Sequence, residues 1–376
     1  MHQTTTPRQN LLNVFHHKVP AWTPVVALGD GYNRPIHMPP SFYQGAEGIL
    51  TCRALSSHFD LDTLDRIGEP WTETYTNVRY THTCAGEIDT YEWETPHGVI
   101  RRRTRRVEYP CADGSPALST LFTVEWPVKS IDDYAAFADI FDDMRYQFHP
   151  DEVARQTQAL GEAGICTVGG PPSPLGMSVR VYMGVEYLAF AYKDHPKELH
   201  VLFEHIADNG YRCYQGLAET GIDAVINYDD TTTYAISLAM FDELEADYLN
   251  RTADILHARG KFLIHHACGH VSRLLSRFRC TSIDGFDGPA SPPIGDTPVS
   301  AARQAWGEGI VIMPFTDQVA LATGDPHTIR HSIRAMFEQA SSPRGFIVNV
   351  LPPPGVPAEH LWLAVDEAKR LAREFF

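Results

Sequence analysis

The segment FLIHHACGH, residues 262–270, is an apolar strand-like run that ends in side chains able to bind a metal ion. His266 and Cys268 are two positions apart, so an extended chain directs both toward one face, where an imidazole nitrogen and a thiolate can reach the same ion. This pair suits Zn²⁺, and a catalytic zinc site needs about three protein ligands and one open position. A buried cysteine beside a hydrogen-bonded histidine would fit the same spacing.

Candidates for a third ligand lie nearby in the expected fold. Asp229 and Asp230 directly follow the strand-like run Ala224–Tyr228, and His265 and His270 flank the His-x-Cys pair. Aspartates at a strand end often cap the next helix, and neighbouring histidines are often surface groups, so these alternatives stay open. We expect Asp230 to be a catalytic residue and Asp229 to bind substrate.

Aromatic and small residues complete the candidate site. Tyr228, a second catalytic candidate, and Tyr234, a substrate-binding candidate, could donate hydrogen bonds or stack on an aromatic substrate, although either would also suit a core. Gly29-Asp30-Gly31 follows the first expected strand, where backbone atoms could approach a small substrate or simply form a turn. Asp30 and Tyr32 are therefore substrate-binding candidates.

Strand-like and helix-like segments alternate from about residue 150 onward, which is typical of parallel βα units. The expected strands are Trp22–Leu28, Ile165–Gly169, Ala224–Tyr228, Phe262–His266, Ser282–Phe286, Ile310–Pro314 and Phe346–Val350. The expected helices are Asp151–Ala163, Pro196–Glu219, Met240–Arg259 and Asp325–Ala340. With no Gly-rich dinucleotide motif after the first strand, this pattern predicts a (β/α)8 TIM barrel rather than an open Rossmann sheet. Catalytic groups of such barrels project from the carboxyl ends of the strands.

Residues 72–128 have a different pattern, in which TYTNVRY, IDTYEWET and VIRRRTRRVEY alternate in polarity between turn signals. We expect an antiparallel β insertion between the first and second barrel units, at a barrel mouth where it could form a lid or a docking surface. The arginine run at residues 101–106 is interpreted as a solvated strand rather than an anion site. With no linker or repeat, residues 1–376 are expected to form one domain.

Composition excludes several classes of protein. The chain has 376 residues and 43% apolar residues, too many for a disordered chain, and no apolar run long enough to cross a bilayer. Its formal charge of −16 repels polyanions, so we expect neither nucleic acid nor a membrane as a partner. The odd count of 7 cysteines and the lack of a signal-like start favour a cytoplasmic protein without disulfides.

The sequence also resembles the uroporphyrinogen decarboxylase superfamily, in particular its cobalamin-dependent methyltransferase branch. The resemblance is strongest in Leu256–Lys261 followed by the strand and His266-Ala267-Cys268-Gly269. Looser matches, in the same order along the chain, are Arg8-Gln9-Asn10, Val19-Pro20, Pro24-Val25, Thr95–Gly98, Glu125–Lys129, Asp132–Tyr134, Met183-Gly184, Asp229-Asp230 and Phe346–Val350.

The resemblance implies that His266 and Cys268 bind zinc, which a second cysteine completes after the last strand in that branch. Here Val350 is followed by LPPPGVP, with no cysteine. A zinc ion with a single thiolate is a stronger Lewis acid, which favours demethylation of a methyl ether over methylation of a thiol. Porphyrin decarboxylation is disfavoured because the segment Val25–Arg34 lacks the paired arginines of the porphyrin decarboxylases.

The resemblance therefore implies a zinc methyltransferase of the O-demethylase type. It would exchange a methyl group between a small substrate, such as a methoxyaromatic ether or a thiol, and the cobalamin of a separate corrinoid protein. A partner is needed because the chain has no D-x-H-x-x-G motif of its own. The alternatives are a metal-free decarboxylase or lyase acting on a small acidic substrate, and a binding protein without turnover.

Overall fold

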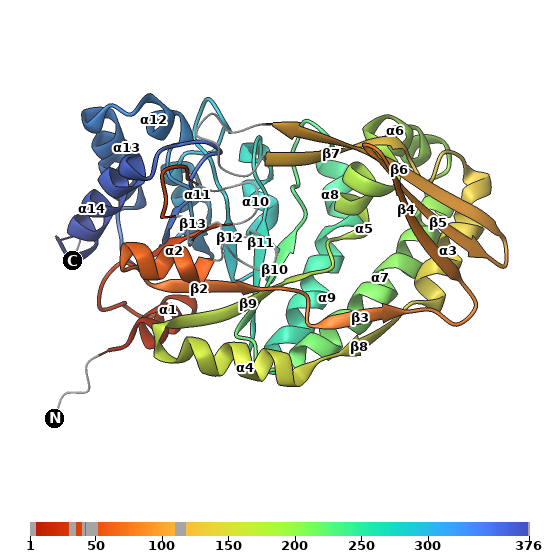
Figure 1. Ribbon diagram of the computed structural model, residues 1–376, viewed down its shortest axis with the longest axis horizontal. Helices are drawn as coiled ribbons and strands as arrows, with labels where there is room; N and C mark the ends of the chain where they lie inside the picture. The colour runs from red at the N-terminus through yellow and green to blue at the C-terminus, as the bar shows by residue number, and fades with distance from the viewer. Residues whose placement is uncertain (1–4, 30–34, 40–41, 43–51, 110–117, 375–376) are drawn as a thin grey trace.

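The computed structural model describes residues 5–29, 35–39, 42, 52–109 and 118–374. Its centre is a six-stranded parallel sheet with the strand order β13-β12-β11-β10-β9-β2 (Figure 1). The strands are β2 (Thr63–Ile67), β9 (Gly164–Gly170), β10 (Ala224–Tyr228), β11 (Phe262–His266), β12 (Gly285–Asp287) and β13 (Val311–Met313). All seven expected barrel strands overlap an observed one.

Two further parallel strands close the sheet toward a barrel. Strand β1 (Val25–Ala27) pairs with β14 (Val348–Val350), and single bridges from Ile312 to Phe346 and from Phe315 to Asn349 connect β14 to β13. Among the described residues no ladder joins β1 to β2. There the carboxylate of Asp62, just before β2, accepts hydrogen bonds from Val25 N at 3.1 Å and from the Trp22 indole. The predicted (β/α)8 fold is confirmed.

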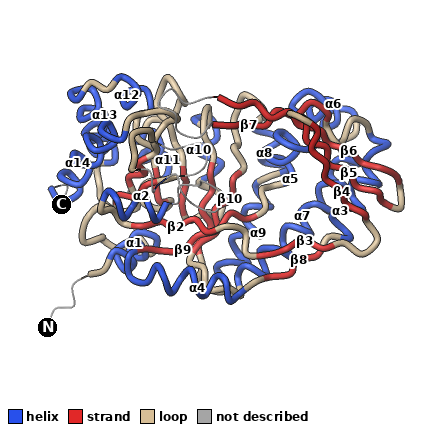
Figure 2. Tube along the Cα trace, viewed as in Figure 1, coloured by secondary structure: helices blue, strands red, loops and turns tan. Residues whose placement is uncertain are grey.

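Helices cover the outside of the strands, as the alternation of patterns predicts (Figures 1 and 2). They are α1 (Pro7–Phe15), α2 (Cys52–Phe59), α3 (Tyr134–Asp143), α4 (Pro150–Leu160), α5 (Pro174–Met177), α6 (Gly184–Asp194), α7 (Pro196–Ala218), α8 (Leu238–Leu244), α9 (Ala246–His257), α10 (Leu275–Phe278), α11 (Val299–Trp306), α12 (Gln318–Thr323), α13 (Pro326–Ala340) and α14 (Ala358–Glu374). A π-helical turn, Ser178–Tyr182, separates α5 from α6. None of the described helices is long and apolar enough to span a membrane.

The antiparallel insertion is confirmed, but its position in the chain differs from the expectation. It follows the second barrel strand, β2, rather than the first. The sequence TLDRI forms β2, but its charged residues had not indicated a strand. The insertion contains β3 (Trp71–Thr74), paired with β8 (Arg145–Phe148), and a sheet of β4 (Arg79–Ala85), β5 (Ile88–Thr95), β6 (Gly98–Tyr109) and β7 (Leu118–Glu125). This sheet lies at the opposite end of the molecule from α12–α14 (Figure 1).

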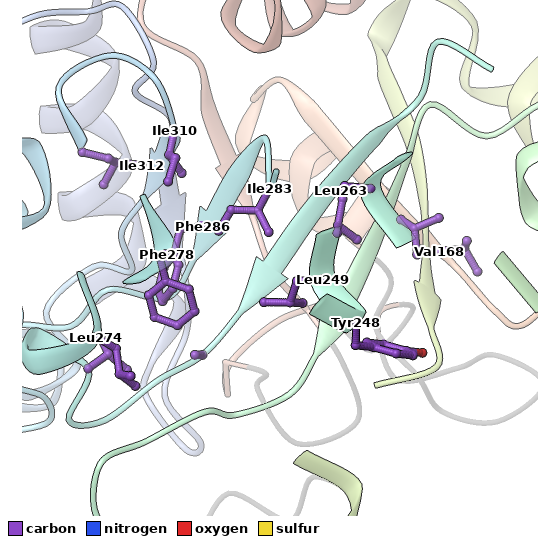
Figure 3. Packing of buried hydrophobic residues seen from close by; sticks show 14 of the residues in the cluster. Val168, Tyr248, Leu249, Leu263, Leu274, Phe278, Ile283, Phe286, Ile310 and Ile312 are labelled. Atoms are coloured by element: carbon purple, nitrogen blue, oxygen red, sulfur yellow. The ribbon is translucent and has the colours of Figure 1, made fainter. Parts of the chain in front are cut away.

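Strand alternation separates two cores. Ala224, Ile226, Phe262 and Ile264 belong to a cluster inside the barrel, which α1 closes with Leu11, Val14 and Phe15. The intervening residues, such as Val225 and Leu263, belong to a larger cluster shared with the covering helices. Figure 3 shows part of this outer cluster, where Phe278 and Phe286 pack with ring centroids 4.9 Å apart. The same alternation decides which polar residues reach the barrel mouth.

Candidate active site

The carboxyl ends of β10, β11 and β12 converge on a cavity of about 1120 Å³. Tyr228 ends β10, His266 ends β11, and both line this cavity together with Cys268 and Arg66. Apolar side chains of several types contribute to the remaining wall, among them Pro314, Phe315 and Leu351. The cavity therefore combines a mostly apolar wall with a small polar centre at the mouth of the barrel, where TIM-barrel active sites lie.

His266 lies at the centre of this polar group. Its Nδ1 is 3.1 Å from Asp287 Oδ2, and its Nε2 is 3.3 Å from Asp230 Oδ1. Burial opposes the charged imidazole, but the hydrogen bonds to Asp230 and Asp287 outweigh it and raise the pKa of His266 well above its ordinary value. When Nδ1–H donates to Asp287, the Nε2 lone pair is free to bind a metal ion.

Asp287 is itself held by residues from other strands. Its Oδ2 accepts a hydrogen bond of 2.9 Å from Arg66, and its Oδ1 accepts one of 3.0 Å from the Asn349 amide. Burial would raise the pKa of Asp287, yet the Arg66 guanidinium and His266 lower it to about 2. Arg66 also donates to the Tyr228 hydroxyl at 2.6 Å. This network fixes the carboxylate, the imidazole and the phenol relative to one another.

Asp230 lies on the other side of His266. Its backbone has a φ of +53°, a conformation that Asp tolerates better than most residues, and its N–H donates to the His266 carbonyl at 3.1 Å. Arg180, from the π-helical turn, donates to Oδ2 at 2.8 Å, whereas Oδ1 lies 3.6 Å from Cys268 Sγ. Burial raises the pKa of Asp230, but His266 and Arg180 lower it to about 2. The carboxylate is therefore ionised, and its Oδ1 lies next to His266 Nε2 and Cys268 Sγ.

Asp230, His266 and Cys268 fit a metal ion in type and spacing. One ligand atom from each residue can be chosen so that all lie within 4.8 Å of one another. A carboxylate oxygen, an imidazole nitrogen and a partly exposed thiol form a set that zinc accepts, and three protein ligands leave a fourth position open toward the cavity. Asp287 supplies the outer hydrogen bond that usually orients a metal-binding histidine.

Other expected site residues lie elsewhere. Asp229, expected to bind substrate, is buried and accepts a hydrogen bond from the Ser173 N–H, because it falls on the helix-facing side of its strand. Tyr234 is 75% exposed and packs on His270 with ring centroids 4.0 Å apart, outside the cavity wall. His265 is also buried on the helix side. We therefore correct the placement of Asp229 and Tyr234 in the substrate site.

The first-strand loop is only partly described. Gly29 lines the cavity, whereas Asp30 and Tyr32 lie outside the described residues. Sequence reasoning also missed Arg66, Arg180, Asp287 and Asn349. Among these four, Asp287 could have been predicted, because an acidic residue directly after an expected barrel strand lies at the end of the barrel that carries catalytic groups. Arg66 and Arg180 lie in a strand and a helical turn that the pattern did not indicate, whereas Asn349 lies within the expected strand Phe346–Val350.

Comparison with known proteins agrees with this architecture. The family model described as "Uroporphyrinogen decarboxylase (URO-D)" matches residues 117–371. The chain belongs to the uroporphyrinogen decarboxylase family. A search of curated protein sequences gave no match.

Solved structures extend the comparison of this family member to the whole chain. A methyltransferase from Methanosarcina mazei is similar at 12% identity, with a TM-score of 0.60 over 98% of this chain and 99% of the other. A B12-independent methionine synthase from Shewanella sp. W3-18-1 aligns over 72% of this chain and 75% of the other, at 11% identity and a TM-score of 0.40. The first similarity shows that the fold, insertion included, is shared by a protein of nearly the same extent.

Proposed function

We propose that this member of the uroporphyrinogen decarboxylase family is a zinc-dependent methyltransferase. It would move a methyl group between a small methylated substrate and the cobalamin of a separate corrinoid protein. The observation that carries the proposal is that Asp230 Oδ1 lies beside His266 Nε2 and Cys268 Sγ, and that His266 and Cys268 line the barrel-mouth cavity. The similarity in fold to a methyltransferase of equal extent supports it.

His266, Cys268 and Asp230 would hold the zinc ion. The ion would act as a Lewis acid toward the heteroatom that carries the methyl group. One thiolate and one carboxylate neutralise Zn²⁺ without a second thiolate, and Arg180 withdraws charge from the Asp230 carboxylate. This donor set supports the preference for a methyl ether, an O-demethylation, over a thiol.

The remaining polar residues would position the substrate. Tyr228 accepts its hydrogen bond from Arg66, so its own O–H can donate to a substrate oxygen in the cavity. Phe315 lies 5.9 Å from the His266 ring between centroids and offers an apolar surface beside the donors. A methoxyaromatic ether combines an ether oxygen with a flat apolar ring, and this combination matches the wall.

A second candidate function is a metal-free decarboxylase or lyase. A protonated His266 between the Asp230 and Asp287 carboxylates is electrostatically stable without an ion, as its raised pKa reflects. In that case the imidazolium would act as a general acid toward an acidic substrate. The two candidates differ in whether a metal ion is bound.

Metal content tests the proposal directly. The full chain is purified without chelators after growth with zinc, as wild type, Cys268→Ser and His266→Ala, and the metal is measured by elemental analysis. We expect each variant to lose about one equivalent of zinc. Cys280→Ser is the matched control, because Cys280 is also an exposed cysteine but lies outside the cavity wall.

Methyl transfer from methyl ethers to cob(I)alamin is then assayed with the same proteins. We expect activity in wild type and Cys280→Ser and its loss in Cys268→Ser. Equal zinc in wild type and Cys268→Ser, or decarboxylation that is insensitive to this substitution, would contradict the proposal and support the metal-free candidate.

A further inference from the structure

A second group of metal-binding side chains lies behind the first, on the helix-facing side of β10 and β11. Asp229 follows β10, His265 is in β11, and Glu245 joins α8 to α9. Their exposed fractions are 1%, 0% and 1%, whereas Cys268 in the barrel-mouth group is exposed. One ligand atom from each can be chosen so that all three lie within 4.8 Å of one another.

The imidazole of His265 lies between the two carboxylates without a hydrogen bond to either. Nδ1 is 3.9 Å from Asp229 Oδ2, and Nε2 is 4.0 Å from Glu245 Oε1. Both ring nitrogens, Asp229 Oδ2 and Glu245 Oε2 have no hydrogen-bond partner in the structure. Buried polar atoms are nearly always paired, so four unpaired atoms within one buried group of side chains indicate a missing ligand.

The charges of this group point to the nature of that ligand. Two carboxylates are fully buried here, and no lysine or arginine of the described chain forms an ion pair with either. A divalent cation would neutralise both carboxylates and use the neutral imidazole as a ligand.

We infer that Asp229, Glu245 and His265 bind a second divalent transition-metal ion, distinct from the ion at the barrel mouth. Ligands that each lie about 2 Å from one zinc ion are about 3–4 Å apart. One imidazole nitrogen and one oxygen from each carboxylate, all within 4.8 Å of one another, therefore need to close by only about 1 Å to bind one ion. One imidazole and two carboxylates suit Zn²⁺ or a similar transition ion better than Ca²⁺ or Mg²⁺, which prefer oxygen ligands.

Neighbouring residues hold the three ligands in place. Thr231 donates to Glu245 Oε1 at 2.5 Å, and the Ser173 N–H donates to Asp229 Oδ1 at 2.6 Å. The rings of Phe278 and Phe286 pack on His265 with centroids 5.0 and 5.5 Å away. These contacts leave Asp229 Oδ2, Glu245 Oε2 and the imidazole nitrogens without hydrogen-bond partners. The ion would have a structural role, tying β10 and β11 to the α8–α9 junction directly behind the barrel mouth.

Zinc content of the full chain tests this site separately from the first. We compare wild type, Glu245→Gln and the double variant Cys268→Ser/His266→Ala, all loaded with zinc and dialysed before elemental analysis. Glu245→Gln preserves the shape of the side chain and removes its charge, and Glu243→Gln, two residues earlier on α8, is the matched control. We expect Glu245→Gln to lose about one equivalent and the double variant to retain one.

The outcomes for the two sites are distinguishable. If the barrel-mouth proposal alone is wrong, wild type holds one equivalent, which Glu245→Gln removes and the double variant retains. A folded double variant without zinc, or a folded Glu245→Gln variant with as much zinc as wild type, would overturn the buried site.

A spectroscopic measurement on the double variant keeps the test decisive if Glu245→Gln does not fold. Refolded in the presence of Co²⁺, the double variant is expected to show ligand-field bands without the thiolate-to-cobalt charge-transfer band that Cys268 gives in wild type. Because the buried ligands have almost no exposed surface, the ion should also remain during dialysis against a chelator and leave only on unfolding. Absence of bound cobalt in the folded double variant would overturn the inference.

Discussion

Asp287 never touches the cavity centre, yet it decides which nitrogen of His266 is available there. Its Oδ2 is 3.1 Å from Nδ1 and is held in place by Arg66 and Asn349. Orientation of an imidazole by an outer carboxylate fixes its tautomer before a ligand binds. Affinity for zinc at the barrel mouth should therefore depend on a residue that is not a ligand.

We expect Asp287→Asn to weaken zinc binding at the barrel mouth about 10–100-fold, as is typical for loss of an outer-sphere partner of a metal-binding histidine. Asn keeps the size of Asp but lacks its charge. The measurement is competition with a chromophoric chelator, with the exposed Asp242→Asn as the control. Unchanged affinity would show that Asp287 does not orient a ligand.

The sequence predicted that His266 and Cys268 lie at the same end of the barrel as the pair Asp229-Asp230, because all of them end or follow apolar runs that are recognisable as barrel strands. It could not distinguish Asp229 from Asp230. The two residues have the same side chain, and the difference arises from the positive φ of Asp230, which turns its carboxylate toward His266. Such a turn has no signal in the polarity pattern.

Among the elements, β2 is a strand that was not predicted because its sequence contains charged residues. Asp65 and Arg66 within TLDRI would suggest a loop, but each is buried by an ion pair, Asp65 with Arg53 and Arg66 with Asp287. The partners that neutralise these charges come from α2, the helix before β2, and from β12, which is distant in sequence. Strands β10 and β11, in contrast, are apolar and have the predicted boundaries.

The junction between β1 and β2 should respond to pH through Asp62. Burial raises the pKa of this carboxyl from 3.8 to about 6 despite its hydrogen bonds from Trp22 and Val25. The folded state therefore binds this proton more tightly than the unfolded state. The contribution of protonated Asp62 to the free energy of unfolding is full below about pH 4 and is lost as the pH rises through about 6.

In Asp62→Asn this contribution is absent. We expect the difference in free energy of unfolding between pH 4.5 and pH 7 to change by about 2 kcal/mol relative to wild type, from a pKa shift of about two units. Urea unfolding at the two pH values measures it. The exposed Asp60→Asn is the control, and a pH dependence identical to wild type would contradict the raised pKa.

At the scale of the whole molecule, the barrel and the insertion share a core. Ile100 of β6 and Val128 after β7 belong to the same buried cluster as Phe286 of β12. The arginines of β6 form cross-strand ion pairs, such as Arg101 with Glu92, so this sheet carries a solvated charged face, as the sequence indicated. We propose that the described residues form one domain.

Phe286→Ala should destabilise this shared core by about 3–5 kcal/mol, since it removes a fully buried ring and leaves a cavity. Phe122→Ala on β7, where the ring is 52% exposed, is the control and should change stability by less than about 0.5 kcal/mol. Unfolding is followed by circular dichroism and by tryptophan fluorescence. If Phe286→Ala shifted the unfolding transition seen by only one of these two methods, the barrel and the insertion would be separate cooperative units.

The left-handed backbone at Asp230 limits how this protein could evolve. Few residues adopt a φ of +53° without strain, and Gly, Asn and Asp are the main ones. A glutamate would keep the carboxylate but not the conformation. Mutational routes that keep this conformation therefore include Asn, Gly and His, each one nucleotide change from an aspartate codon, and all three abolish the negative charge. Loss of the acidic group is thus an easy evolutionary step, and its replacement by another acid a difficult one.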